Sequence, residues 1–162
     1  MTAFYTHELA AGAQYPSGIS GATVVPAAHY AGSGCNNATN KDEFLDLDIT
    51  VSLKNAANNP PTAGEAIKTY VLYAMNGTNY EDGLHATDGT NGTTPSNPAP
   101  NANALVDSHG VQAITGPQKW TVREIPLLPY PYTVEIYNGC TGATGSAMTV
   151  LQYGRKFETH DN

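Results

Sequence analysis

FLDLDITVSL, the sequence of residues 44–53, alternates aliphatic and polar side chains from Leu45 to Leu53. A period of two places alternate side chains on opposite faces of an extended strand. The aliphatic set would face a core, while Asp46 and Asp48 would keep the other face in water. The stretch therefore predicts a half-buried strand of an antiparallel sheet.

Further strands are expected along the chain, separated by segments rich in Gly, Pro and Asn. The expected strands are residues 66–75, which should be central, 111–115, 120–125, 132–137 and 147–153. Residues 55–64 and the proline-rich residues 126–131 predict connectors. Nowhere do apolar residues recur with helical spacing over three turns. The predicted fold class is all-β, an antiparallel β-sandwich with jelly-roll or Greek-key-like connections.

The chain of 162 residues fits one domain, but its first 40 residues differ from the rest. Residues 1–40 contain one formally charged side chain, Glu8. They would form either peripheral strands of their own domain or an extended N-terminal arm that orders on a neighbouring subunit. Residues 41–162 would form the β-sandwich domain. The Asn/Gly/Pro-rich residues 84–104 would form a long loop that contacts a partner.

Composition narrows the classes of partner. The net charge is −7, from 7 Lys and Arg against 14 Asp and Glu, which disfavours direct binding to nucleic acid. No apolar run is long enough to span a membrane, and the first residues do not resemble a secretion signal. We therefore expect a soluble protein made in a cytoplasm. Charged residues make up 13% of the chain, about half the ~25% usual in globular domains. A partner that covers such a surface has to remove water from few charged groups, which favours assembly.

The sequence offers few groups for chemistry. Cys35 and Cys140 lack metal-site spacing and are expected to be free thiols, with a single disulfide bridge as the alternative. The five histidines, His7, His29, His85, His109 and His160, are scattered singly, and no nucleophile motif is present. Oxygen-bearing side chains in residues 76–82 could hold Ca²⁺, although they lack EF-hand spacing. The expectation is a protein that is not an enzyme and needs no cofactor.

Two stretches resemble a known group of proteins. VLYAMNGTNYEDG, residues 71–83, and VREIPLLP, residues 122–129, followed by Asn138 and by Thr141-Gly142, are similar to segments of small virion proteins of tailed bacteriophages. In this chain Leu128 replaces the first of the usual paired prolines, and Gly139-Cys140 lengthens the Asn-to-Thr spacing. The resemblance covers roughly residues 43–155. It implies a β-sandwich attached to the outer surface of the phage head, a trimer at a local threefold axis.

The first hypothesis is therefore a capsid decoration (cement) protein that binds the major capsid protein and is located in the virion. Candidate partner contacts lie in the N-terminal 40 residues, in the long loop and near the proline-rich connector: Phe4, Tyr5, Tyr15, Tyr30, Asn91, Pro95, Pro98 and Tyr130. The alternative is a carbohydrate- or receptor-binding β-sandwich of a phage tail or surface protein, because ten tyrosines suit sugar platforms as well as protein interfaces. A hydrolase is the third hypothesis and would need acids or histidines that converge from separate strands.

Overall fold

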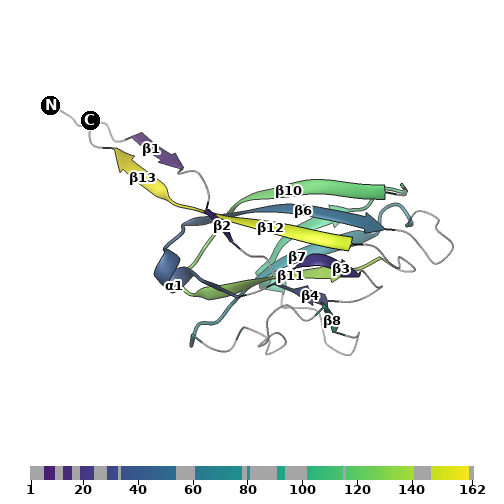
Figure 1. Ribbon diagram of the computed structural model, residues 1–162, viewed down its shortest axis with the longest axis horizontal. Coiled ribbons are helices and arrows are strands. Elements are labelled where there is room, and N and C mark those ends of the chain that lie inside the picture. The colour runs from purple at the N-terminus through teal and green to yellow at the C-terminus, as the bar shows by residue number, and fades with distance from the viewer. Residues whose placement is uncertain are drawn as a thin grey trace.

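A computed structural model describes residues 6–9, 13–15, 19–23, 29–32, 34–53, 61–77, 80, 91–93, 102–114, 116–140 and 147–160. Two antiparallel sheets pack face to face, and a two-stranded ribbon leaves them at one end (Figure 1). The prediction of an all-β sandwich is confirmed.

The first sheet, called the β6 sheet, has the spatial order β10 (Gly116–Pro126), β6 (Phe44–Leu53), β12 (Ala147–Arg155) and β2 (Ala13–Tyr15), with β3 (Ser20–Thr23) also paired to β12. The second, called the β7 sheet, has the order β8 (Asn91–Thr93), β4 (His29–Ala31), β11 (Pro131–Asn138), β7 (Ala66–Tyr73) and β9 (Leu105–Gly110), with β5 (Cys35–Asn36) also paired to β11. The chain passes from the β7 sheet to the β6 sheet between β9 and β10 and returns at 127–130. Neighbouring strands such as β6 and β12 are distant in sequence.

The core lies between the two sheets and is built by the alternation seen in the sequence. The five aliphatic side chains of β6, at positions 45, 47, 49, 51 and 53, are each at most 1% exposed. Opposite them, β11 contributes Tyr132, Val134 and Ile136 to the same apolar cluster. Burial of this apolar surface supplies most of the favourable free energy of folding.

The β7 sheet is buried on both faces. Tyr70 and Leu72 point away from the main core and form a second, small apolar cluster with Ala104, the last residue of the short η2 helix (Ala102–Ala104). Partly buried Tyr80 and Tyr137 pack against this cluster. The central position expected for the strand at 66–75 is confirmed, because β7 pairs with both β11 and β9.

Other predicted boundaries were less accurate. The strand expected at 111–115 is wrong: Val111 to Ile114 lie in the crossing between β9 and β10, and the strand precedes them as β9. The strands expected at 120–125 and 147–153 extend further, as β10 and β12. One helical turn, α1 (Asn37–Asn40), was not expected, and the polar C-terminal residues contain β13 (Phe157–His160).

Most described segments within residues 1–40 belong to the sandwich. β2 and β3 pair with β12, while β4 and β5 pair with β11. Asn37 donates hydrogen bonds to the carbonyl oxygens of Asp42 at 2.9 Å and Leu128 at 2.8 Å. These described segments therefore form strands of the two sheets.

β1 (Thr6–Leu9) is different, because it pairs only with β13 among the described strands. The register runs from Thr6 opposite His160 to Leu9 opposite Phe157. Figure 1 shows this ribbon projecting from the sandwich, with both chain ends at its tip. The projecting arm is thus made from both ends of the chain and not from the N-terminal residues alone.

The two stretches that carry the phage resemblance meet in the structure. The hydroxyl of Tyr73, at the end of β7, donates to the Pro126 carbonyl oxygen at 3.2 Å and accepts from the Leu128 N–H at 3.3 Å. Tyr73 therefore fixes the proline-rich crossing from β10 to β11. These two stretches of the chain therefore have a structural role at this crossing.

The two cysteines are free and buried, and they provide a test of the fold. Burial raises the pKa of the Cys35 thiol, and burial together with the nearby Glu65 carboxylate raises the pKa of Cys140 to about 11. A buried thiol with a raised pKa is slow to react. We expect a thiol reagent to label neither cysteine in the folded protein at pH 8 and to label both after denaturation. Rapid labelling of the native protein would contradict this packing.

The same pKa shift predicts a dependence of stability on pH. The folded state holds the Cys140 proton more tightly than the unfolded chain, whose thiol pKa is near ~8.5. The stabilisation is complete below that value and is lost as the pH rises toward about 11. Urea unfolding at several alkaline pH values, compared between the protein and a Cys140→Ser variant, measures this contribution: the difference between the two should shrink as the pH rises.

Candidate functional site

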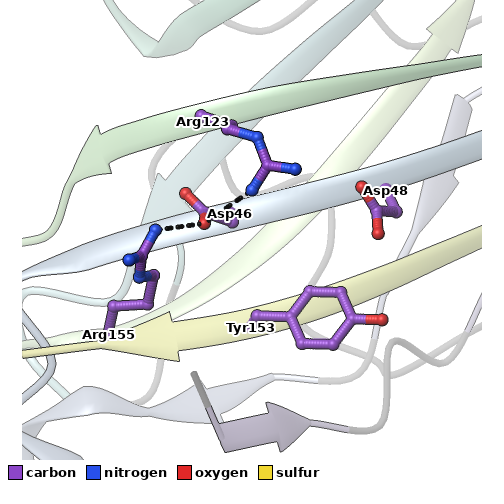
Figure 2. A pocket seen from close by; sticks show the side chains of 5 residues that line it. All are labelled: Asp46, Asp48, Arg123, Tyr153 and Arg155. Atoms are coloured by element: carbon purple, nitrogen blue, oxygen red, sulfur yellow. Dashed lines mark hydrogen bonds and ion pairs between the residues drawn. The ribbon is translucent and has the colours of Figure 1, made fainter. Parts of the chain in front are cut away.

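A polar hollow of about 340 Å³ lies on the outer face of the β6 sheet. It is lined by Asp46, Asp48, Arg123, Tyr153 and Arg155. Figure 2 shows that these side chains come from three neighbouring strands, with the acids on β6, Arg123 on β10, and Tyr153 and Arg155 on β12. The hollow therefore lies over the central strand of the sheet.

Alternation and register together place these groups. Even-numbered residues of β6 point away from the core, and Tyr153 stands directly opposite Asp46 on the neighbouring strand. Asp48 has Thr121 opposite it on one side and Leu151 on the other. Cross-strand neighbours have Cβ atoms roughly 5 Å apart, so side chains at these positions are in reach of one another.

A bulge in β10 brings Arg123 onto this face. The register between β10 and β6 shifts between Val122 and Ile125, and Glu124 has a positive φ of 55°. A non-glycine residue in this conformation costs on the order of 1 kcal/mol or more. Here the bulge turns the Glu124 N–H toward the Asp46 Oδ1, to which it donates at 2.8 Å.

Asp46 anchors the site. Its Oδ2 accepts from Arg155 at 3.0 Å and from Arg123 at 3.3 Å, while its Oδ1 accepts the Glu124 N–H. The Asp46 side chain is 5% exposed, whereas those of Arg155 and Arg123 are 24% and 63% exposed. The expectation that this acid faces solvent is therefore wrong, because the two guanidinium groups cover it.

Asp48 is held more loosely. It is partly buried, and its Oδ1 accepts a hydrogen bond from the Thr121 hydroxyl at 2.7 Å. It also lines a second hollow of about 300 Å³ that continues along the sheet past Thr50, Lys119 and Leu151. Because the two hollows share Asp48, we call them together the polar groove; Trp120 and Thr121 also line its second part.

The candidate partner contacts do not converge on this groove. Tyr30 is a correction, because its side chain is 1% exposed and belongs to the main core, so it cannot meet a partner. Its strand pairs with β8, which puts Asn91 opposite Tyr30. Tyr15 lies in β2 opposite Gln152, and partly buried Tyr130 lies in the crossing before β11. Phe4, Tyr5, Pro95 and Pro98 lie outside the described residues.

The other groups considered for chemistry are only partly described. His109 stacks on Trp120, with ring centroids 4.1 Å apart, and Trp120 donates to the Asp107 carboxylate at 3.1 Å. This contact joins β9 and β10, and Trp120 also lines the second hollow. Glu81, Asp82 and His85, and with them most of the Ca²⁺ candidate at 76–82, lie outside the described residues. Within the described part of the chain no three His, Cys, Asp or Glu side chains gather as a metal site.

A buried ion pair occupies the outer face of the β7 sheet. His29 Nδ1 and Glu135 Oε1 form a short contact between β4 and β11, with side-chain exposures of 2% and 0%. The His29 ring also rests on Tyr137, with centroids 4.7 Å apart. Burial, followed by the charge of Glu135, raises the pKa of the neighbouring Tyr70 hydroxyl. Because both side chains are buried, the pair links β4 to β11 and is not accessible to a ligand.

Sequence reasoning did not identify Arg123, Tyr153 and Arg155 as a group. One signal was available in VREI, residues 122–125, where two core-facing residues stand three positions apart. Such a break in alternation indicates a bulge, and bulges redirect side chains. The pairing of β12 with β6, which brings Arg155 beside Asp46, has no local signal in the sequence.

Comparisons with known proteins add no family to these observations. No protein-family model matches the sequence, and no curated protein matches it significantly. No helix in the described part of the chain is long and apolar enough to cross a membrane. What the fold and the groove define is a β-sandwich with a polar outer face and a projecting terminal ribbon.

Proposed function

We propose that the protein is a capsid decoration (cement) protein of a tailed bacteriophage, attached to the outer surface of the head. It binds the major capsid protein, forms a trimer at local threefold axes and reinforces the junctions between capsomers. The role is structural and needs no catalytic group.

The observation that carries this proposal is the β1–β13 ribbon. A two-stranded ribbon with no third strand or helix against it is marginally stable in water. The ribbon projects from the sandwich, and among the described strands none pairs with it beyond its own two, β1 and β13. A surface that packs on it or extends it by a strand would supply the missing stabilisation, as in other strand-addition interfaces. An assembled shell offers such a surface at every capsomer junction.

Attachment of this kind stabilises a shell by mass action. A protein that binds only the assembled state shifts the equilibrium toward it by RT ln(1 + [L]/Kd), about 2.7 kcal/mol per site at a hundredfold excess over Kd. The low charge of this chain favours such contacts, because few charged groups must lose water. Many weak sites on one particle then add up to a large effect.

The test measures occupancy on empty shells assembled from the major capsid protein encoded nearest to this gene. The full chain should bind saturably and raise the temperature at which the shells break apart. Removing residues 1–10, which contain β1, should abolish occupancy. This deletion spares β2, β3 and β4 and also the core residues Ile19 and Tyr30.

A matched control removes residues 161–162, which follow β13, and should bind as the full chain does. Circular dichroism and sedimentation establish that each variant is folded and report its oligomeric state. Absence of the full chain from the shells, or full occupancy by the β1 deletion, would refute the attachment proposed here.

A further inference from the structure

The polar groove of the β6 sheet has the properties of a ligand site that shell attachment does not use. We infer that this groove, centred on Asp48, Tyr153 and the two arginines, binds a neutral oligosaccharide. The inference is independent of capsid attachment, because it concerns the sheet face and not the terminal ribbon.

The geometry provides fixed donors. A guanidinium carries five N–H donors, and the contacts of Arg123 and Arg155 with Asp46 each use one Nη1 nitrogen. Because Asp46 is buried and accepts from both, it fixes the position of the two groups before a ligand arrives. A site whose donors are held in advance loses less entropy on binding.

The groove also provides an acceptor and an aromatic ring. Asp48 uses Oδ1 on Thr121, and Oδ2 has no hydrogen-bond partner among the described residues. Figure 2 shows the ring of Tyr153 beside the acids, with its hydroxyl directed away from Arg155. Donors, an acceptor and a ring side by side match a sugar, which carries hydroxyls around its edge and C–H groups on its faces.

Charge decides between a neutral and an acidic ligand. The two arginines and the two aspartates that line the first hollow cancel formally, and Lys119 in the second hollow adds one positive charge, so the first hollow itself offers no net attraction to an anion. The whole chain carries −7, which repels polyanions at long range. A neutral oligosaccharide avoids both costs.

Backbone geometry decides between a sugar and a peptide. An extended peptide gains most of its affinity by adding its main chain to a free sheet edge. β6 lies between β10 and β12, and both neighbours pair with it over most of its length, so the backbone under the groove is already used. Only side chains face the ligand, which suits a polyhydroxylated molecule better than a peptide.

The experiment exposes the isotopically labelled full chain to arrays and NMR titrations with neutral oligosaccharides, sialylated and sulfated oligosaccharides, and acidic peptides. At least one neutral oligosaccharide should bind at millimolar concentration or tighter and shift signals of β6, β10 and β12. Tyr153→Ala and Asp48→Asn should each weaken its binding about tenfold or more. Thr149→Ala, on the same face of β12 but lining neither hollow, serves as the matched control and should bind unchanged.

Each other outcome overturns the inference. Binding of acidic oligosaccharides or acidic peptides alone would assign the groove to anions or to a protein partner. Binding of a neutral oligosaccharide that survives both substitutions would place the sugar elsewhere on the molecule. A complete absence of binding would leave the groove without a sugar ligand. Thermal unfolding of Asp48→Asn close to that of the parent chain excludes misfolding as the cause of a loss.

Discussion

Replacing Glu135 by Ala should lower the free energy of unfolding by about 3–5 kcal/mol, the range measured when one member of a buried ion pair is removed. Glu135 is 0% exposed and bonds His29 Nδ1 across the boundary between β4 and β11. Without the carboxylate, a His29 ring that is 2% exposed loses its charged partner inside the protein. Urea unfolding of the variant measures the loss.

The Glu135→Gln variant separates hydrogen bonding from charge. Its amide oxygen can still accept from His29, so we expect a smaller loss of about 1–2 kcal/mol. A double-mutant cycle with His29→Ala and Glu135→Ala gives the coupling of the two residues directly. Additive effects of the two substitutions would show that the pair contributes no energy of its own.

Replacing Asp46 by Ala should lower the free energy of unfolding by about 2–3 kcal/mol, because three donors lose a charged acceptor. The estimate is below that for Glu135 because Arg123 and Arg155 reach solvent and can be hydrated after the change. Of the three donors, the Glu124 N–H is the least able to find another hydrogen-bond acceptor, because the bulge with its positive φ holds it in place. Urea unfolding again provides the measurement.

Asp48→Ala is the matched control for this prediction. It removes an acid two positions along the same face of β6, but one whose hydrogen bond from Thr121 is exposed. We expect a loss of no more than about 0.5 kcal/mol. Equal losses for the two substitutions would mean that the guanidinium cover and the bulge contribute nothing to stability at Asp46.

The sequence predicted those strands whose burial follows from their own residue pattern. The alternation from Leu45 to Leu53 predicted β6 and its buried face because a half-buried strand needs nothing beyond its own pattern. β9 was missed because LVDSHG, residues 105–110, shows no such pattern, and all six of its residues are partly or fully exposed. Its place in the sheet comes from pairing with β7, which the local sequence does not encode.

The candidate site could be predicted only in part. Asp46 and Asp48 were recognisable as acids on one strand face, but the burial of Asp46 depends on two arginines located 77 and 109 residues away in sequence. Tyr30 was misjudged for a related reason. HYA, residues 29–31, is too short to show which side faces the core, and pairing with β11 decides it.

The pairing of Thr6 with His160 affects the order in which the strands can form during synthesis and folding. β1 must wait until β13 has been synthesised, because most of the sequence lies between these two strands. Closing so long a loop has a high entropic cost, so strands of the sandwich, whose partners are nearer, have the advantage in forming first. The ribbon is then the final element to assemble. On the attachment proposed above, a chain still being synthesised would lack this ribbon and could not yet bind a shell.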